Sequence, residues 1–374
     1  MKVIHIITGL NDGGAEGALF RLVTASSSEF DHIVISLMDN GKYGDELISL
    51  GIKVVTLNMP RGKVTLKALK LLYAELKREK PDVVQTWMYH ADFLGGVIAK
   101  LSGCKKIFWG IRHSNLSMDV NSKSTIIFAR LCAWLSPWIP TKIISCAEEA
   151  VLVHKKFGYR GSFSVVPNGY DTTKFVPNLT LRKLTRSEFN LAEDTPLVGF
   201  VARWDPQKDH ENLLLAIQII QTRYPNVCCA LIGTGCDTDN IDLISKIQSL
   251  GIEKNIMLLG RRNDIPAIMN ALDIHVLSSC GEAFPNVVAE AMSSGTPCIV
   301  TEVGDAPLIV GTFGWVVPPK DPGKLAIAID LALREKQLGL SWRKRELGCS
   351  DRIKNTFSLH RMVQGYSKNW LSDR

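Results

Sequence analysis

The stretch G-E-A-F-P-N-V-V-A-E-A-M-S-S-G-T-P, residues Gly281 to Pro297, decides how the rest of the sequence is interpreted. Pro285 suits the first position of a helix, and Gly295 is placed to end it. Backbone N–H groups at the start of a helix attract anions. Because Glu282 precedes that start and Glu290 follows it by one turn, the stretch predicts a site for a phosphorylated, polyhydroxylated ligand. The alternative is a capped amphipathic helix with two solvated acids.

Strand-like apolar runs alternate with helix-like segments on both sides of this stretch, which predicts parallel, doubly wound sheets. A chain of 374 residues is too long for one ordinary core. We therefore expect two α/β domains, over residues 1–175 and 196–355, joined by a linker over 176–195, where the polar sequence lacks clear periodicity. Ligands of such sheets bind at the carboxyl ends of the strands.

The composition is that of a folded protein, with 46% hydrophobic and 22% charged residues. The nine cysteines show no C-x-x-C spacing, which favours reduced thiols in the cytosol over disulfides or zinc. The sequence has no N-terminal signal pattern and no apolar run of the roughly 18–20 residues that span a bilayer. These features predict a cytoplasmic protein.

The positive charge is unevenly distributed. Residues 1–180 hold 22 Lys and Arg against 15 Asp and Glu, whereas residues 181–374 hold 22 of each, so the whole net charge of +7 lies in the first half. This favours an anionic partner there, such as a phospholipid surface or a phosphorylated acceptor. A solvated basic face is the alternative. Nucleic acid is not expected, because the sequence contains no recognition module.

The apolar segment 126–144 contains two tryptophans, Trp134 and Trp138, close to Arg130 and Lys142. Prolines within it argue against one continuous helix. The tryptophans are compatible with contact to a membrane surface or with burial in a helix pair, and burial is the favoured interpretation.

Two features of the first half are candidates for ligand binding. The loop from Gly9 to Gly17 follows a strand and precedes a helix, but it lacks the G-x-G-x-x-G spacing of dinucleotide sites. Gly13 and Gly14 can bring backbone N–H groups against a ligand, or they can form a plain turn. His113 comes at the end of a predicted strand over 106–114, where a functional role and a structural role are both open.

Together these residues resemble the retaining glycosyltransferases of family 4, which have the GT-B fold of two Rossmann-like domains facing across a cleft. The resemblance covers nearly the whole chain and is greatest to bacterial enzymes of surface-polysaccharide assembly. The motifs that carry it are G-G-A-E at Gly13–Glu16, P-N-G-x-D at Pro167–Asp171, G-x3-R-x4-K at Gly199, Arg203 and Lys208, E-x7-E at Glu282 and Glu290, and S-G-T-P at Ser294–Pro297.

The resemblance implies that the first domain binds the acceptor and the second binds a nucleotide-sugar donor. The last segment, 356–374, would form a helix that crosses back to the first domain. Met362, Tyr366 and Trp370 recur every four residues there and give the helix one apolar stripe. Packing of that stripe on the second domain is the alternative.

The resemblance also implies individual roles. Arg203 and Lys208 would bind the donor diphosphate and stabilise it as it leaves, so that no metal ion and no other cofactor is required. Glu290 would accept the ribose hydroxyls, and Glu282 would hydrogen-bond the transferred sugar. His113 would lie near the reacting centre.

The resemblance implies the following complete set of site residues. The predicted catalytic residues are Glu282, His113, Arg203 and Lys208. The predicted donor-binding residues are Gly13, Gly14, Arg203, Lys208, Gly233, Gly235, Arg262, Glu282, Ala283, Phe284, Pro285, Asn286, Val287 and Glu290. Within this set the glycine pair would close over the diphosphate, the backbone at 285–288 would add to the phosphate site, and Gly233, Gly235 and Arg262 would hold the nucleoside.

The implied reaction is transfer of a sugar, with a UDP-sugar as the favoured donor, to a hydroxyl of a glycan or a polyprenyl-diphosphate-linked oligosaccharide. The product would be capsule, O-antigen or exopolysaccharide, and the enzyme would work at the inner face of the plasma membrane. Front-face substitution is preferred to double displacement, because the family uses the position of Glu282 as a hydroxyl ligand. A nucleotide-sugar epimerase and a non-catalytic assembly scaffold are the alternatives; a phosphorylase is not expected, because it needs a pyridoxal lysine.

Overall fold

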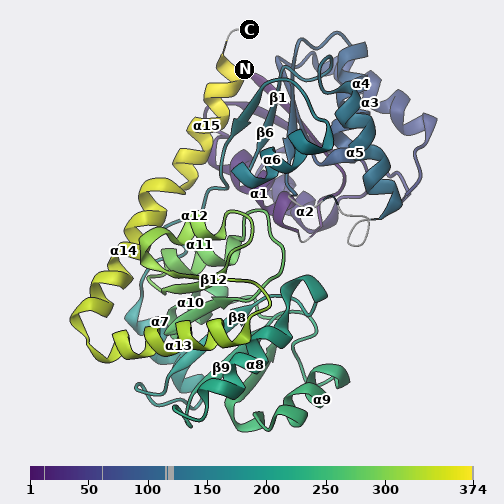
Figure 1. The fold of residues 1–374 in the computed structure, drawn as a ribbon. Coiled ribbons are helices and arrows are strands. Elements are labelled where there is room, and N and C mark those ends of the chain that lie inside the picture. Colours follow the sequence, from purple (N-terminus) through teal and green to yellow (C-terminus); the bar gives the residue numbers. More distant parts are fainter. Residues whose placement is uncertain (12, 61, 114–115, 117–121, 373–374) are drawn as a thin grey trace. The chain divides into compact units, whose positions relative to one another are not determined.

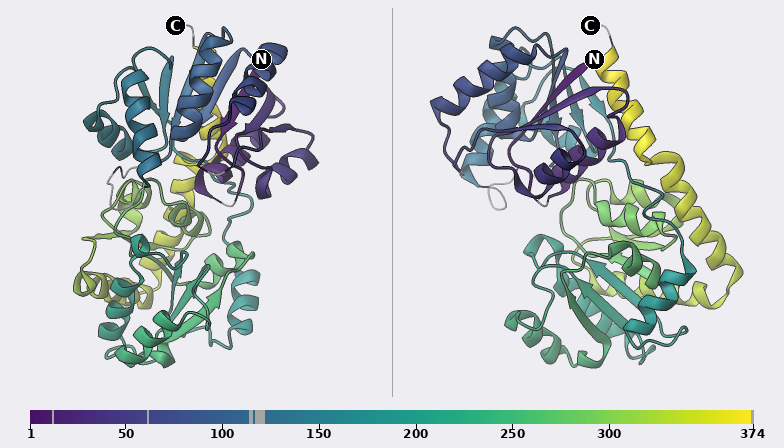
Figure 2. Two further views of the ribbon diagram at one scale, coloured as in Figure 1. Left: turned by 90° about the vertical axis from the view of Figure 1, so that its right-hand side faces the viewer. Right: turned by 180° about the vertical axis from the view of Figure 1, so that it is seen from behind.

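The computed structural model describes residues 1–11, 13–60, 62–113, 116 and 122–372. The chain forms two α/β units (Figures 1 and 2). The first unit contains residues 1–169 together with the segment that begins at Leu359, and the second contains residues 170–358. Each unit is built on one parallel sheet, as the alternation of strands and helices predicts.

The first sheet has the strand order β3-β2-β1-β4-β5-β6-β7, so the direction of winding reverses between β1 and β4. Its central strands are buried on both faces and are therefore rich in apolar residues. The strands are β1 (Lys2–Ile7), β2 (Asp31–Ser36), β3 (Lys53–Thr56), β4 (Val83–Trp87), β5 (Lys106–Ile111), β6 (Lys142–Ser145) and β7 (Phe163–Val165).

Helices cover both faces of the first sheet (Figure 1). On one face α3, α4 and α5 pack side by side, and on the other α1 packs against both α2 and α15. The helices are α1 (Gly14–Ala25), α2 (Gly41–Ser49), α3 (Leu66–Glu79), α4 (Tyr89–Leu101), α5 (Lys123–Leu135), α6 (Glu148–Phe157) and α15 (Leu359–Leu371).

Helix α15 completes the core of the first unit, and the right-hand view of Figure 2 shows it running beside the first sheet. Met362, Tyr366 and Trp370, the apolar stripe seen in the sequence, are buried in this core. The indole N–H of Trp370 donates to Gln85 Oε1 at 3.3 Å. The described part of α15 therefore packs on the first unit, although it lies at the far end of the sequence.

Two buried histidines lie beneath α15. The indole N–H of Trp87 donates to His5 Nδ1 at 3.2 Å, so His5 must carry its proton on Nε2 and donate to His32 Nδ1 at 3.0 Å. His32 in turn donates from Nε2 to Ser26 Oγ at 2.9 Å. Burial lowers the pKa of His5 well below its usual value and that of His32 to about 4. The network therefore requires both rings to be neutral.

The second sheet has the order β10-β9-β8-β11-β12-β13, and its winding reverses between β8 and β11. On one face α8 packs against α13 and α9, and on the other α11 packs against α10, α12 and α14. The strands are β8 (Leu197–Val201), β9 (Cys228–Ile232), β10 (Ile256–Gly260), β11 (Ile274–Leu277), β12 (Cys298–Thr301) and β13 (Trp315–Val317). The helices are α7 (Leu179–Glu188), α8 (His210–Ile220), α9 (Ile241–Leu250), α10 (Ile265–Ala271), α11 (Asn286–Ser293), α12 (Ala306–Val310), α13 (Pro322–Gln337) and α14 (Leu340–Thr356).

The predicted linker over 176–195 is wrong in one respect, because half of it is the helix α7, which belongs to the second unit. Helix α7 packs on α10 and begins with a cap in which Asn178 Oδ1 accepts from two backbone N–H groups. The sequence of α7 has few apolar residues, and its attachment to the unit is largely polar.

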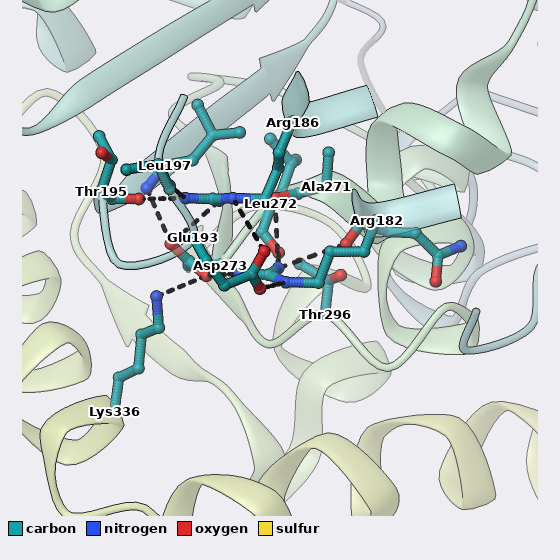
Figure 3. Close-up of polar contacts among 12 residues, drawn as sticks. Arg182, Arg186, Glu193, Thr195, Leu197, Ala271, Leu272, Asp273, Thr296 and Lys336 are labelled. Atoms are coloured by element: carbon teal, nitrogen blue, oxygen red, sulfur yellow. Dashed lines mark hydrogen bonds and ion pairs between the residues drawn. The ribbon is translucent and has the colours of Figure 1, made fainter. Parts of the chain in front are cut away.

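That attachment is a buried ionic cluster centred on Asp273 (Figure 3). The side chain of Asp273 is 2% exposed and lies 2.7 Å from Arg182 Nη2, 2.7 Å from Lys336 Nζ and 3.7 Å from Arg186 Nη1. The backbone N–H of Leu197 donates to Asp273 Oδ2, the oxygen nearest Arg186, at 2.8 Å. Asp273 directly precedes β11 and Leu197 begins β8, so the cluster ties α7 to the amino ends of the two central strands.

Among the residues that the structure describes, no helix is both long enough and apolar enough to cross a membrane.

Candidate active site

The reversal of winding between β8 and β11 determines where the second unit can bind a ligand. In open α/β sheets, ligands bind beyond the carboxyl ends of the strands at such a reversal. Arg203 and Lys208 follow β8, and Glu282 follows β11. These residues, 74 positions apart in the sequence, therefore meet at the expected place.

Lys208 and Glu282 are in direct contact. Lys208 Nζ lies 2.6 Å from Glu282 Oε1, and the hydroxyl of Ser279 donates to the same oxygen at 2.7 Å. The Lys208 side chain is 22% exposed and that of Glu282 12% exposed, so the pair lies partly buried at the surface of the unit. Ser279 is not among the residues predicted from the sequence, although its position just beyond β11 was a usable signal.

The backbone around Lys208 is held rigidly. Asp205 caps the short 3-10 turn Pro206–Lys208 by accepting from the N–H of Gln207 at 2.9 Å. The hydroxyl of Ser278 donates to the carbonyl of Lys208 at 3.1 Å, and the N–H of Cys280 donates to the carbonyl of Gln207 at 2.9 Å. The loops after β8 and β11 are thus bonded to each other, which fixes the lysine against the acid.

The loop after β12 holds Glu282 and Ala283 from the other side. The N–H of Asp305 donates to the carbonyl of Ala283 at 2.9 Å. Gly304 has a φ of +51°, and a Cβ there would lie 2.5 Å from the carbonyl oxygens of both Glu282 and Ala283. A residue without a side chain is therefore required, because the two backbones approach so closely.

Arg203 lies on the surface. Its Nε and Nη2 atoms are 3.1 and 3.0 Å from Asp205 Oδ2. Because exposed ion pairs are weak, this contact leaves the guanidinium able to bind a phosphate.

Helix α11 begins at Asn286, one residue later than predicted, because Pro285 has an extended ψ of 101° and serves as the N-cap. Tyr170 donates its hydroxyl to Asn286 Oδ1 at 2.6 Å. Glu290 is the fifth helical residue and is partly exposed. Gly295, at a φ of +82°, follows the helix and ends it as predicted.

Phe284 is not an exposed contact for a sugar. Its side chain is buried, stacks on Tyr170 at 6.3 Å between ring centroids and packs edge-on against Phe357 at 5.6 Å. Its side chain belongs to the core, so the predicted contact with the sugar can come only from its backbone. Tyr170 is not among the predicted site residues, and its place within the P-N-G-x-D motif was the signal that could have identified it.

The predicted nucleoside contacts differ in their surroundings, because the two glycines lie in a tight turn and Arg262 is paired with acids. Gly233 and Gly235 both have positive φ, and a Cβ at Gly233 would lie 2.1 Å from the carbonyl oxygen of Ala202, so this turn packs closely on the segment that leads to Arg203.

Arg262 is instead held by two acids, Asp264 at 2.6 Å and Glu188 at 2.9 Å, and these hydrogen bonds raise the pKa of its guanidinium. The role of Arg262 as a nucleoside ligand stays a prediction, since a ligand would have to displace at least one of these acids.

The glycine pair lies in the first unit, beyond β1 and beside the reversal of its sheet. Helix α1 begins at Gly14, four residues before the predicted helix, and Gly13 is its N-cap. A Cβ at Gly13 would lie 2.3 Å from Glu16 Oε2. Asp12, within the same loop, lies outside the described residues. The loop is therefore shorter than expected, and its glycines mark the amino end of a helix.

His113 also lies in the first unit, two residues beyond β5, which ends at Ile111 and is shorter than predicted; Ser114 lies outside the described residues. Its neighbour Arg112 stacks on Trp87 at 4.4 Å and donates to Asn168 Oδ1 at 2.7 Å and to the hydroxyl of Tyr366. These contacts fix the end of β5 to the P-N-G-x-D motif and to α15.

The chain matches two family models. Residues 12–174 match the model described as Glycosyltransferase Family 4, and residues 182–346 match the model described as Glycosyl transferases group 1. The chain belongs to glycosyltransferase family 4. The glycosyltransferase therefore has, in each half, the domain that its family model describes.

Curated relatives are glycosyltransferases, and two bacterial ones cover most of the chain. An Escherichia coli protein named UDP-Gal:alpha-D-GlcNAc-diphosphoundecaprenol alpha-1,3-galactosyltransferase is 28% identical over 305 residues, which are 80% of this chain and 77% of the relative. The putative glycosyltransferase EpsF of Bacillus subtilis is 26% identical, covering 80% and 79%.

Solved structures show the same GT-B fold. The Alr3699/HepE protein of Anabaena in complex with UDP has a TM-score of 0.86 at 21% identity, over 98% of this chain and 99% of that one. WaaG, a glycosyltransferase of lipopolysaccharide biosynthesis, has a TM-score of 0.75 at 14% identity, over 99% and 100%. The enzyme is thus a glycosyltransferase, and proteins of lipopolysaccharide biosynthesis are among those that it resembles. These comparisons favour neither an epimerase nor a scaffold.

Proposed function

We propose that this glycosyltransferase moves a sugar from a UDP-sugar, with retention and without a metal ion, to a hydroxyl of a polyprenyl-diphosphate-linked glycan. The E. coli relative is named for a UDP-galactose donor and a diphosphoundecaprenol-linked acceptor. The Anabaena structures of the same fold contain UDP and UDP-glucose. These names support a uridine donor and a lipid-linked acceptor.

The contact between Lys208 and Glu282 carries the proposal. It places a cation suited to a leaving diphosphate within 2.6 Å of an acid suited to the sugar hydroxyls. The scissile bond of a nucleotide sugar joins the diphosphate to the sugar. Lys208 and Glu282 would therefore contact the two sides of that bond. Arg203 and the start of α11 would bind the rest of the diphosphate.

Positive charge at this point would lower the reaction barrier. Negative charge builds on the diphosphate as the bond to the sugar breaks, and a fixed cation stabilises it more than water does. Arg203 and Lys208 would supply that charge, which supports a metal-independent reaction.

The environment of Glu282 supports front-face substitution. Its Oε1 accepts from both Lys208 and Ser279, and a carboxylate so engaged is a weak nucleophile. In the proposed step the acceptor hydroxyl forms the new bond to the anomeric carbon on the face from which the diphosphate leaves. A phosphate oxygen takes the hydroxyl proton, so the configuration is retained.

The remaining assignments complete the site. Glu290 would accept the two ribose hydroxyls, since it lies one turn inside α11. Gly13 and Gly14 would approach the diphosphate, and His113 would contact the transferred sugar. An acceptor with a lipid anchor would be used at the inner face of the plasma membrane, with the first unit, which is the more basic one, against anionic lipid.

The test is transfer of radiolabelled sugar from UDP-sugars to a polyprenyl-diphosphate-linked acceptor. Lys208→Ala and Glu282→Ala should each reduce kcat/KM by about 10²–10³-fold, the usual cost of removing one group that stabilises a transition state. Lys246→Ala is the matched control, because Lys246 also pairs with an acid, Glu211 at 2.8 Å, but on the exposed surface of α9. Undiminished transfer by both site variants would refute the roles given to these residues.

Two further measurements separate the finer claims. Proton NMR of the product should show the anomeric configuration of the donor, and inversion would contradict the mechanism. Activity should persist in excess EDTA. Conversion of the nucleotide sugar without any acceptor would instead identify an epimerase.

A further inference from the structure

Helix α5 and the turn after it expose two large aromatic side chains (α5 in Figure 1). Trp134 is 66% exposed and Trp138 is 61% exposed, so the burial favoured from the sequence is wrong. Their rings meet edge-on at 5.9 Å between centroids. Indole exposed to this degree on a folded surface leaves a large apolar area in water, and such area marks an interaction site.

The two tryptophans belong to a longer surface strip, which we call the tryptophan face and which consists of Ile127, Arg130, Trp134 and Trp138. Ile127, Arg130 and Trp134 recur at intervals of three or four and so lie on one side of α5, and Trp138 follows in the turn after the helix. Ile127 is also exposed. The opposite side of α5 is buried in the first unit by Ile126, Ala129, Cys132 and Ala133. The orientation of the tryptophan face is therefore fixed by core packing.

The turn that carries Trp138 is equally well anchored. The N–H of Trp138 donates to the carbonyl of Leu135 at 3.0 Å, and the hydroxyl of Ser136 accepts from the N–H of Arg160 at 2.8 Å. Ile139 packs against Gly96, where a Cβ would approach it to 3.2 Å. The tryptophans are thus presented on a rigid base and lose little conformational entropy on binding.

The charged residues of α5 and of the turn after it are all basic. Arg130 within it is exposed, as are Lys123 at the start of α5 and Arg160 beside Ser136. The sequence has no acidic residue between Asp119 and Glu148. This differs from the other exposed apolar pair with the same spacing, Ile327 and Leu331 on α13, which has Asp330 between its members.

We propose that the tryptophan face is the surface by which the enzyme docks on an anionic phospholipid bilayer. Tryptophan partitions to the boundary between lipid headgroups and acyl chains, and lysine and arginine beside it are attracted to anionic headgroups. A protein partner would account for the apolar area, but the basic residues Lys123, Arg130 and Arg160 beside it favour anionic lipid. The purpose of docking rests on the proposed lipid-linked acceptor, whereas the docking itself does not.

The experiment measures binding of the full chain to vesicles without donor or acceptor. Sedimentation with vesicles of phosphatidylcholine alone and of phosphatidylcholine mixed with phosphatidylglycerol gives the partition coefficient. The variants are Trp134→Ala/Trp138→Ala, Arg130→Ala/Arg160→Ala, and the matched control Ile327→Ala/Leu331→Ala. All six positions are exposed, so the fold should persist, and the melting temperature of each variant checks this.

The wild type should bind the anionic vesicles, and the tryptophan variant should lose about tenfold or more of its partition coefficient. The arginine variant should lose about fivefold or more, and less in about 0.5 M salt, because salt screens headgroup charge. The control should bind like the wild type. Brominated lipid should quench tryptophan fluorescence in the wild type and not in the tryptophan variant.

Equal binding of the wild type and the tryptophan variant would overturn the proposal. Failure of the wild type to bind anionic vesicles would also overturn it. Self-association that the tryptophan variant abolishes, without vesicle binding, would assign the face to a second copy of the chain and equally overturn it. Binding of UDP-sugars, measured by thermal shift, should be the same in wild type and the tryptophan variant. Failure of donor binding in both would count against the proposed function and leave the docking result standing.

Discussion

Replacement of Asp273 by asparagine should destabilise the second unit strongly. The carboxylate is 2% exposed and balances Arg186, which is 1% exposed, together with the partly buried Arg182 and Lys336. Asparagine preserves the shape and can still accept from Leu197, but it leaves the buried Arg186 with only the exposed Glu193, 4.0 Å away, as a counter-charge. Breaking a buried ion pair from one side costs about 3–5 kcal/mol.

The loss should be visible as a lower melting temperature. For a unit of this size each kcal/mol lowers Tm by about 2–4 °C, so the expected decrease is about 6–20 °C in a thermal scan followed by circular dichroism. Asp330→Asn is the matched control, because Asp330 also meets two arginines, Arg223 at 3.3 Å and Arg334, but at the surface. It should cost no more than about 1 kcal/mol.

The double variant Asp273→Asn/Arg186→Met should recover part of the stability that Asp273→Asn loses, because it removes the most deeply buried unbalanced charge. The reasoning fails if Asp273→Asn is no more harmful than the surface control. It also fails if removal of Arg186 makes the single variant worse.

Two other predictions follow from described contacts. The stability of the first unit should fall as pH decreases from about 6.5 to about 4. In that range histidine in the unfolded chain binds a proton, while buried His32, with its pKa of about 4, and His5 stay neutral. The free energy of unfolding should fall by about 1.4 kcal/mol per pH unit for each ring, and a urea midpoint that does not change over this range would contradict the prediction. Gly233→Ala should reduce the free energy of unfolding by more than about 1 kcal/mol and weaken donor binding, because its Cβ would lie 2.1 Å from the carbonyl oxygen of Ala202. Gly51→Ala is the control, since Gly51 also has a positive φ but open space around it, and it should cost less in the same unfolding assay. Equal losses would refute the steric explanation.

The fold and the position of the site were predictable from the sequence. Alternating strands and helices fix a parallel sheet, and residues that follow neighbouring strands must meet at one edge. Lys208 and Glu282 illustrate this, because each follows a strand and the strands pair. Their direct contact and the part of Ser279 depend on loop geometry that no local pattern encodes.

The features that the sequence did not reveal share a cause, which is that the decisive partner is distant in sequence. Helix α7 has few apolar residues, and its arginines acquire a role only through Asp273. Phe284 is buried by Tyr170 and Phe357.

Trp134 and Trp138 are exposed because the other side of α5 already fills the core, and composition cannot show which side of an apolar helix will be buried. Arg262 meets Glu188 for the same reason that α7 was missed.

The place of α15 affects how the chain is made. Residues 1–169 leave the ribosome without the helix that covers Trp87 and His5, and the 189 residues of the second unit must be synthesised first. At usual elongation rates this delay is about 10–40 s. During that time the part of the core that α15 covers in the folded first unit stays exposed to solvent.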